Sequence, residues 1–157
     1  MVLQFASLAD AAALATMSRD LIEVGLPWRY RAQSLRQLIA DADTVTLVAR
    51  DEDALAGFGV MRIGDERAHL LLMAVRPVRQ RHGVGRSMLQ WLIASAATAG
   101  VASVHVELRA RNTAAQAFYL AHGFAETLRV PGYYAGRESA IRMLRMLRAP
   151  MLALPKP

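Results

Sequence analysis

The amino-acid sequence predicts a mixed α/β domain, with a mostly antiparallel sheet that contains one parallel strand pair. Residues 44–50, 54–63 and 68–75 are apolar or alternating runs separated only by the polar turns DED and GDER, and this spacing is typical of an antiparallel meander. The pattern then changes to helical spacing over residues 85–99, followed by another strand at residues 102–109. A strand, helix, strand unit joins parallel neighbours, so helices are expected to flank the sheet.

Two helices are expected before the meander. Residues 7–24 carry apolar side chains at helical spacing behind Ser7, a residue type that caps helix N-termini. Residues 34–40 form a second, shorter candidate helix. The intervening stretch GLPWRYR is then a loop with two large aromatic side chains, Trp28 and Tyr30.

The chain is expected to end with a helix over residues 113–121 and two strands at residues 123–130 and 138–147. With 157 residues and no internal repeat or linker, the sequence predicts a single domain over residues 1–147, a size that buries a sizeable core. The proline-rich ending APMLALPKP predicts a flexible tail over residues 148–157.

Composition narrows the class of protein. There is no cysteine, so disulfides, thiolate metal sites and cysteine nucleophiles are excluded, and a reducing, cytoplasmic location is expected. The N-terminal stretch has neither a basic leader nor an uninterrupted apolar segment, which predicts a soluble protein without a signal peptide or membrane span. The net charge of +6 fits nucleic acid, an anionic membrane or an acidic small ligand as partner.

The positive charge is concentrated in one interval of the sequence. No acidic residue occurs between Glu66 and Glu107, whereas several arginines do. These arginines are expected to focus the positive field around the glycine-containing turn that follows residue 79. They are Arg67, Arg76, Arg79, Arg81 and Arg86.

The stretch QRHGVGRS follows a buried strand and opens a helix. A helix N-terminus offers unpaired amides and a positive dipole end, so a phosphate can dock there if side chains leave room. Gly83 and Gly85 leave that room, and Arg81 and Arg86 can add charge-assisted hydrogen bonds. A sharp turn with solvated arginines explains the same residues. A dinucleotide fingerprint and a P-loop are both disfavoured, because the third glycine of the first motif and the lysine of the second are missing.

QRHGVG resembles the QxxGxG signature of the GNAT superfamily of N-acetyltransferases, which bind the pyrophosphate of acetyl-CoA on backbone amides at a helix N-terminus. NTAAQAFYLAHGF is similar to the NxxAxxFYxxxGF segment that follows the next strand in that family. The likeness extends to the order of elements over residues 3–147. It implies a GNAT-like fold, in which the central parallel strands splay apart, and acetyl-CoA as co-substrate.

Within the superfamily, the chain most resembles the enzymes that acetylate the N-terminal alanine of a ribosomal protein. The shared segments are ELRARN, GYYAGRESAIRML and LPW at residues 26–28. There are two departures: that subgroup usually has an asparagine near Leu72, and Ser139 replaces the aspartate of its GREDA sequence. The resemblance implies a protein or peptide N-terminal amine as acceptor, with a small-molecule amine as the alternative.

The resemblance also implies which residues contact acetyl-CoA. In the family the pantetheine arm lies between the splayed strands and bonds to the backbone of the first, which corresponds here to Met73 and Val75. Asn112 is expected beside the cofactor. The pyrophosphate is expected at Gln80, Arg81, His82, Gly83, Val84, Gly85, Arg86 and Ser87.

Acetyl transfer to an amine requires a base for the ammonium and an acid for the departing thiolate. Glu107 is the candidate base, because glutamate is disfavoured within a strand such as VHVELR; alternatively, it is an exposed edge-strand residue paired with Arg109 or Arg111. Tyr119 is the candidate acid; alternatively, it packs under the sheet. Since Phe118 and Tyr119 are adjacent on a helix, one of them is expected in the core.

A different class of function remains open. A basic module that binds nucleic acid or the ribosome would use the arginines as its contact surface, but no nucleic-acid motif occurs and no aromatics are interleaved with them. No direct nucleic-acid partner is therefore expected. The four histidines lack the spacing of a ligand set, so no metal site is expected. The sequence predicts neither one acceptor nor an oligomeric state.

Overall fold

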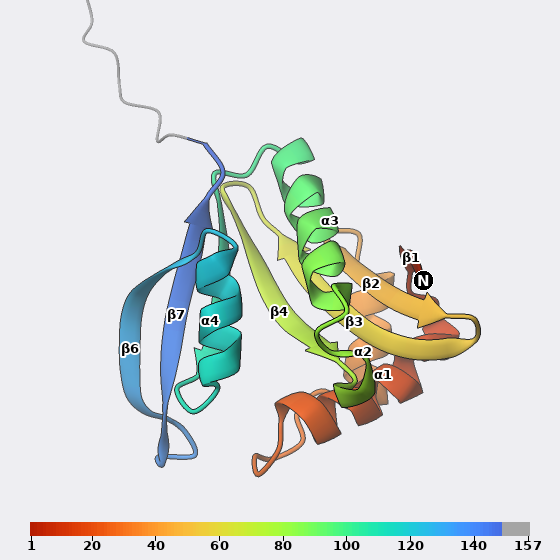
Figure 1. The fold of residues 1–157 in the computed structure, drawn as a ribbon, viewed down its shortest axis with the longest axis horizontal. Helices are drawn as coiled ribbons and strands as arrows, with labels where there is room; N and C mark the ends of the chain where they lie inside the picture. The colour runs from red at the N-terminus through yellow and green to blue at the C-terminus, as the bar shows by residue number, and fades with distance from the viewer. Residues whose placement is uncertain (149–157) are drawn as a thin grey trace, which may run out of the picture.

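The computed structural model describes residues 1–148, which form a seven-stranded sheet with helices on both faces (Figure 1). The strand order is β1-β2-β3-β4-β5-β7-β6. Within these residues the β4–β5 pair is parallel and every other neighbouring pair is antiparallel. This confirms the expected sheet. The tail expected at residues 148–157 lies, apart from Arg148, outside the described residues.

The elements follow the predicted order after the N-terminus. The strands are β1 (Val2–Phe5), β2 (Thr44–Asp51), β3 (Ala54–Ile63), β4 (Arg67–Val75), β5 (Ser103–Arg109), β6 (Ala125–Tyr134) and β7 (Glu138–Met146). The helices are α1 (Ala11–Met17), α2 (Ala32–Ala40), α3 (Val84–Thr98) and α4 (Thr113–Ala121), with the short turns η1 (Leu8–Asp10), η2 (Ser18–Ile22) and η3 (Pro77–Arg79).

The N-terminal segment differs from the expectation. Val2–Phe5 forms an edge strand against β2, which the sequence analysis missed because these mostly exposed residues show no apolar alternation. The single helix expected over residues 7–24 is instead a 3-10 turn, then α1, then a π-helical turn, η2. Near the C-terminus, the strand expected over residues 123–130 begins two residues later and continues to Tyr134.

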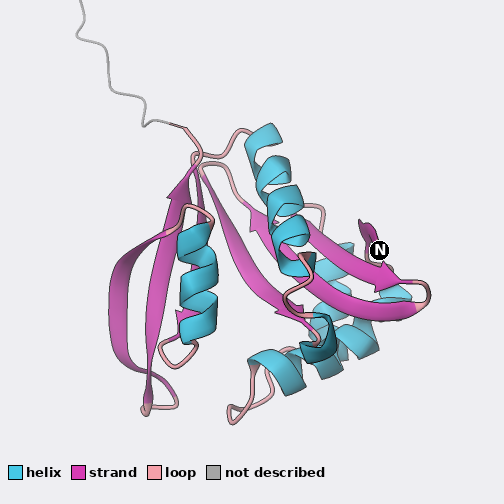
Figure 2. Ribbon diagram, viewed as in Figure 1, coloured by secondary structure: helices cyan, strands magenta, loops and turns pink. Residues whose placement is uncertain are grey.

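Helices cover both faces of the sheet (Figure 2). On one face, α1 and α2 pack on β2, β3 and β4 through side chains such as Leu14, Leu35 and Phe58. On the other face, α3 and α4 share a second core with β2 to β5 and β7, centred on Met88 and Leu92. Burying each such side chain stabilises the fold by about 1.5–3 kcal/mol. Within residues 1–148, no helix has the length and apolar character needed to cross a membrane.

The close contact between α3 and β3 depends on glycine. A Cβ added at Gly57 would lie 2.7 Å from the carbonyl oxygen of Ala74 and 3.1 Å from Cε of Met88. One added at Gly59 would lie 2.9 Å from Cδ1 of Leu92. Because interiors are close-packed, any side chain at these positions would push α3 away from the sheet or displace β4.

The two parallel strands are paired over only part of their length. The β4–β5 register runs from Arg67 opposite Ser103 to Leu70 opposite Val106. Both strands continue beyond these residues, β4 by five residues to its end and β5 by three. The C-terminal halves of β4 and β5 therefore separate, as the resemblance implied.

A β-bulge lies in β4 at the point where this pairing stops. Leu70 and Leu72 pair with consecutive residues of β3, so Leu71 is an extra residue. Side chains alternate along a strand, and the extra residue reverses that alternation. Before the bulge, Ala68 and Leu70 pack in the α3 core; after it, Met73 contacts that core while Leu72 packs with α1 and α2.

Candidate active site

A cavity of about 1600 Å³ lies where β4 and β5 separate. Its walls come from η2 and the loop that follows it, from α2, from β4 and β5, from α4, and from β6 and β7. Every tyrosine of the chain lines it. They are Tyr30, Tyr119, Tyr133 and Tyr134. A site with phenol groups on several walls can place both apolar surface and hydrogen-bond donors around a ligand.

The cavity brings together four of the residues that the sequence analysis assigned to the site. They are Met73 on β4, Glu107 on β5, Asn112 just before α4, and Tyr119 within α4. Within the described part of the chain, Val75 and residues 80–87 do not line this cavity, because they lie at and beyond the C-terminal end of β4. The expected site thus consists of a cavity wall and an adjoining turn.

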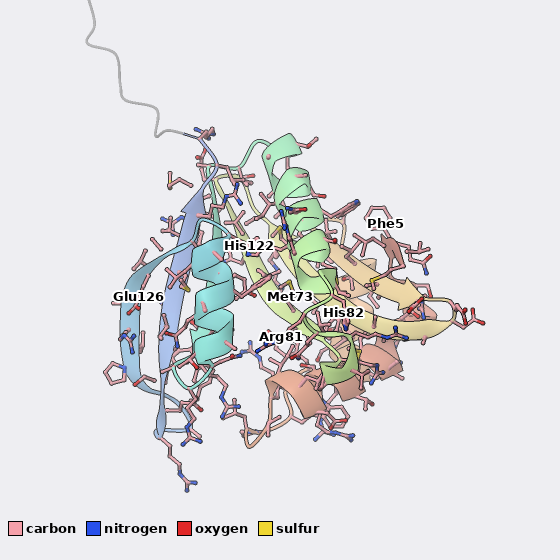
Figure 3. The ribbon with its side chains drawn as sticks, in the orientation of Figure 1. Phe5, Met73, Arg81, His82, His122 and Glu126 are labelled. Atoms are coloured by element: carbon pink, nitrogen blue, oxygen red, sulfur yellow. The ribbon has the colours of Figure 1, made fainter. Side chains whose placement is uncertain are left out.

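The turn after β4 presents backbone amides at the start of α3. Gly83 is the N-cap with φ of 82°, and Arg81 also has a positive φ, 65°, which is uncommon for a residue with a side chain. The amide of Ser87 donates to the carbonyl of Gly83 at 3.0 Å, so the amides of residues 84–86 precede the helical hydrogen-bond ladder. Figure 3 shows Arg81 and His82 beside this end of α3. An anion can approach the amides there.

Gly85 faces the space between α3 and α4. A Cβ at this position would lie 3.6 Å from the ring of Phe118 and 3.7 Å from Cγ2 of Val75, which are ordinary contact distances. Alanine therefore fits at position 85, whereas a longer side chain would project into the space beside Phe118. The left-handed backbone conformation at the N-cap belongs to Gly83 and favours glycine there.

Not all arginines of the acid-free interval lie at the turn, contrary to the expectation. Arg67 begins β4, whereas the turn follows its far end, roughly 25 Å away for a strand of this length. Arg76 is held by a backbone carbonyl at 2.7 Å and Arg79 by a carboxylate at 2.6 Å. The charge nearest the amides of α3 is that of Arg81 and Arg86, both of which are exposed.

The end of β4 also presents backbone groups toward the gap. The amide of Arg76 donates to the carbonyl of Ala56 on β3 at 2.8 Å. Because backbone groups alternate sides along a strand, those of Met73 and Val75 point away from β3. The side-chain amide of Gln80 donates to the carbonyl of Val75 at 3.0 Å. The backbone amides of Met73 and Val75 and the backbone carbonyl of Met73 therefore face the gap between the splayed strands.

Glu107 faces the cavity from β5, which lies between β4 and β7 in the sheet. The alternative of an edge-strand glutamate is therefore wrong. Its carboxylate accepts hydrogen bonds from Nε of Arg142 at 3.1 Å and from the hydroxyl of Tyr134 at 3.5 Å. Its side chain is 31% exposed. The expected pairing with Arg109 is also wrong, because Arg109 pairs with Glu138.

Tyr119 is the buried member of the aromatic pair on α4, with 6% of its surface exposed. Its ring packs edge-on against Phe118 and Phe124, with ring centroids 5.2 and 5.3 Å away. Burial raises the pKa of the Tyr119 phenol, so the group is protonated and able to donate at neutral pH. The residue is thus both part of the core and part of the cavity wall.

Asn112 has a clear local role as the N-cap of α4. Its Oδ1 accepts a hydrogen bond from the amide of Ala115 at 3.0 Å, which satisfies one of the free amides at the helix start. The side chain also lines the cavity. Capping fixes the position of α4, and with it the position of Tyr119.

Two histidines line the cavity next to Glu107. His69 on β4 and His105 on β5 are opposite each other in the parallel register, with ring centroids 5.3 Å apart. His105 also lies 2.8 Å from the hydroxyl of Ser103. Burial lowers the pKa of both imidazoles, and neighbouring positive charges lower it further. In the described chain, no three His, Asp or Glu side chains are grouped so as to hold a metal ion.

The sequence analysis missed the residues that organise the cavity entrance. Arg142 on β7 and Tyr134 at the end of β6 contact Glu107. Glu138 is buried, with 6% of its surface exposed, and pairs with Arg109. The hydrogen bond from Arg109 holds the pKa of the Glu138 carboxyl below its usual range. The only signal in the sequence was GYYAGRESA, which contains Tyr134 and Glu138 but not their partners.

Comparisons with known proteins agree with this architecture. Residues 14–124 match the model of the acetyltransferase (GNAT) family. The ribosomal protein bS18-alanine N-acetyltransferase of Salmonella typhimurium is 39% identical over 95 residues, which span 59% of this chain and 64% of that protein, less than two thirds of its length.

Solved structures share the fold over almost the whole chain. The ribosomal-protein-S18-alanine N-acetyltransferase from Escherichia coli has a TM-score of 0.82 at 26% identity, covering 98% of this chain and 99% of that one. Arabidopsis thaliana NAA60 in complex with acetyl-CoA has a TM-score of 0.83, covering 93% and 98%, and at 15% identity this is a likeness of fold alone. The splayed strands, the turn at α3 and the family match lead to one conclusion: the chain belongs to the acetyltransferase (GNAT) family.

Proposed function

We propose that the chain is an N-acetyltransferase that moves an acetyl group from acetyl-CoA to the α-amine of a protein or peptide N-terminus. The observation that carries the proposal is the cavity between the splayed strands, with Glu107 and Tyr119 on its walls and the turn at α3 beside it. A residue able to accept a proton and one able to donate a proton then lie in the same cavity, as direct transfer to an amine requires.

The structure offers acetyl-CoA two kinds of contact. The free amides of residues 84–86, at the positive end of the α3 dipole, would bind the pyrophosphate, with Arg81 and Arg86 adding charge. The gap-facing backbone groups of Met73 and Val75 would bond to the pantetheine arm. The remaining residues assigned to the cofactor are Gln80, His82, Gly83, Ser87 and Asn112.

Glu107 would take the proton from the acceptor ammonium, directly or through a water molecule. Arg142 and Tyr134 fix the orientation of its carboxylate toward the cavity. Tyr119 would donate its proton to the sulfur that leaves with coenzyme A. Burial raises the pKa of the phenol and makes it a weaker acid, so the transfer requires the thiolate to form in direct contact with it. A gap-facing backbone amide near Met73 would stabilise the developing oxyanion.

An α-amine suits a carboxylate base better than a lysine side chain does. The pKa of an α-amine is about 7.7 to 8.0, against about 10.4 for lysine, so its deprotonation costs about 3 kcal/mol less. The Salmonella and Escherichia relatives are named for an alanine N-terminus, which supports a small first residue. Of the two departures, Ser139 lies in GYYAGRESAIRML, one of the segments that carry this likeness, and Leu72 lies outside those segments. The assignment of the ribosomal protein as acceptor is therefore the finer part of the proposal.

The acceptor class is tested by thiol release with acetyl-CoA across a panel of amines. Peptides that begin with alanine are compared with the same peptides blocked at the α-amine but carrying a lysine, and with polyamines and aminoglycosides. Faster turnover of the alanine peptides is expected. Preference for the blocked lysine peptides or for small amines would refute the N-terminal assignment and leave acetyl transfer intact.

The alternative of a nucleic-acid module has lost part of its support, because Arg67 lies at the far end of β4 from the turn and Arg76 and Arg79 are bonded to other groups of the protein. The cytoplasmic location expected from the cysteine-free sequence stays a prediction.

A further inference from the structure

Arg109, the last residue of β5, joins three parts of the chain. Its Nε and Nη2 lie 2.8 and 2.6 Å from Oε2 of Glu138 at the start of β7. Its Nη1 donates to the backbone carbonyl of Val24 at 2.5 Å. The guanidinium carbon lies 6.0 Å from the ring centroid of Tyr134 at the end of β6, within cation–π range. One side chain therefore links the sheet, the loop after η2 and the β6–β7 turn.

The loop that Arg109 contacts is held together by hydrogen bonds of its own. We call residues 24–31 the entrance loop. Glu23, just before it, is 8% exposed, and its carboxylate accepts hydrogen bonds from the hydroxyl of Ser18 at 2.8 Å and from the amide of Arg29 at 2.7 Å. The indole of Trp28 donates to the carbonyl of Tyr30 within the loop at 3.1 Å. Because the loop is tied internally, its bond to Arg109 positions the loop as a whole.

The segment on the other side of Arg109 is the turn between β6 and β7, residues 133–138, which we call the hairpin turn. Glu138 is buried and accepts hydrogen bonds from the side chain of Arg109 and from the amide of Arg111. A buried carboxylate that loses its charged partner is strongly unfavourable. The hairpin turn would therefore have to shift if Arg109 were removed.

The entrance loop and the hairpin turn both line the cavity. From the entrance loop the lining residues are Leu26, Pro27, Arg29 and Tyr30, and from the hairpin turn they are Tyr133, Tyr134 and Ala135. Neither segment includes the turn at α3, where acetyl-CoA would bind. The two segments are therefore cavity walls that acetyl-CoA leaves available for contact with the acceptor.

We propose that Arg109 is a positioning residue that holds the entrance loop and the hairpin turn at a fixed separation and so sets the affinity for the acceptor. The inference rests on the proposed acetyltransferase function. Arg109 bonds to a carboxylate on one side and a carbonyl on the other through different nitrogens, a geometry that the planar guanidinium fork permits and a single ammonium does not.

The test compares Arg109→Met with Arg111→Met. Arg111 is a matched control, because its side chain is 81% exposed and its Nε lies 4.0 Å from the same carboxylate of Glu138. With a peptide that begins with alanine, Arg109→Met is expected to raise the acceptor KM about 10-fold or more. Its kcat should fall by a smaller factor than KM rises, because Arg142 still orients Glu107 when Tyr134 moves with the hairpin turn. Its affinity for acetyl-CoA, measured by calorimetry, should be unchanged. Arg111→Met should leave all three quantities unchanged.

Hydrogen exchange provides a readout that does not depend on turnover. Amides of residues 24–31 should exchange faster in Arg109→Met than in wild type or Arg111→Met, because the bond to Val24 is lost. If Arg109→Met does not fold, Arg109→Lys must show a smaller rise in the acceptor KM and in the exchange rate of the same amides, since lysine can keep one of the two bonds.

An unchanged acceptor KM in a folded Arg109 variant, a loss confined to kcat, or equal effects at positions 109 and 111 would overturn the inference. Unchanged exchange in the entrance loop would do so independently. A wild-type protein that acetylates none of the amines would refute the proposed function and with it the role in acceptor binding, while the exchange data would still decide whether Arg109 holds the loop.

Discussion

Glu107 on β5 and Arg142 on β7 are directly opposite each other in the sheet, with Oε2 of the glutamate 3.1 Å from Nε of the arginine. The pair leaves the glutamate oriented toward the cavity and half-exposed to it. A carboxylate in this position is constrained in direction yet accessible to an amine or a water molecule.

Glu107→Gln should lower kcat by roughly 10²- to 10⁴-fold, because the amide cannot take a proton. The measurement is kcat against pH for an alanine peptide. Glu126→Gln, which removes an exposed carboxylate paired with Arg129 on β6, serves as control and should keep the wild-type profile. A wild-type profile in Glu107→Gln would rule out its role as base.

Tyr119→Phe should retain acetyl-CoA binding and lose turnover by roughly 10- to 10⁴-fold, the effect of removing a general acid where solvent can partly replace it. Phenylalanine keeps the edge-on packing with Phe124, so the melting temperature should change little. An unaltered kcat with a raised KM would mark Tyr119 as a packing or binding residue.

Gly85→Glu should abolish the binding of coenzyme A, because it places a carboxylate and its bulk where the pyrophosphate is expected, beside Phe118. Gly85→Ala is the matched control, since its Cβ would make only ordinary contacts at 3.6 Å and more. Calorimetric titration with coenzyme A distinguishes the two variants. Equal affinity in Gly85→Glu and wild type would refute the phosphate site at the turn.

Gly57→Ala should lower the free energy of unfolding by about 1–3 kcal/mol, the usual cost of overpacking. Its Cβ would lie 2.7 Å from the carbonyl oxygen of Ala74, which is backbone and cannot easily move. Chemical denaturation measures the change. Gly85→Ala, without such a contact, should not be destabilised in the same way, and equal stability of the two variants would contradict the close contact between Gly57 and the backbone of Ala74 on β4.

Glu138→Gln should destabilise the protein at pH 7 more than at pH 3. The pKa of Glu138 is lowered in the folded state by the hydrogen bond from Arg109, so its contribution to stability is present above the unfolded value of about 4.3 and is lost as pH falls through the folded value. Denaturation at both pH values measures the difference. The control is Glu66→Gln, at a side chain that is 73% exposed. A pH-independent difference for Glu138→Gln would contradict the shift.

The sequence predicted the local backbone structure of the candidate site, which depends on residues that are neighbours along the chain. Gly83 at the start of α3 and Tyr119 in α4 belong to short motifs with fixed local geometry, and both lie where the motifs indicated. Contacts between distant segments could not be predicted. Arg109 reaches Val24 across 85 positions, and Arg142 reaches Glu107 across 35.

The pairing of the last strands explains why these contacts were hidden. The register between β6 and β7 shifts at two irregularities, one of them between Val130 and Tyr134. Side chains alternate between the two faces of a strand with a period of two residues, and this alternation cannot be followed in the sequence through such shifts. The position of Tyr134 relative to Glu107 therefore depends on tertiary structure and is not contained in the alternation of the sequence.

Because Leu71 is an extra residue, the part of β4 that pairs with β3 is one residue longer than the segment of β3 with which it pairs. If it were deleted, Leu72 would follow Leu70 directly, as their partners Val60 and Met61 follow each other on β3, so the bulge would be lost while Met73 and Val75 kept their faces. An extra residue added beside the bulge would instead reverse the faces of one half of the strand. Related chains can therefore gain or lose residues in the turns on either side of β4, and within the strand the one-residue loss that keeps both cores is the loss of the bulge residue itself. Recombination between homologues should accordingly tolerate crossovers before Arg67 and after Val75, and should fail within β4 when it adds a residue beside the bulge.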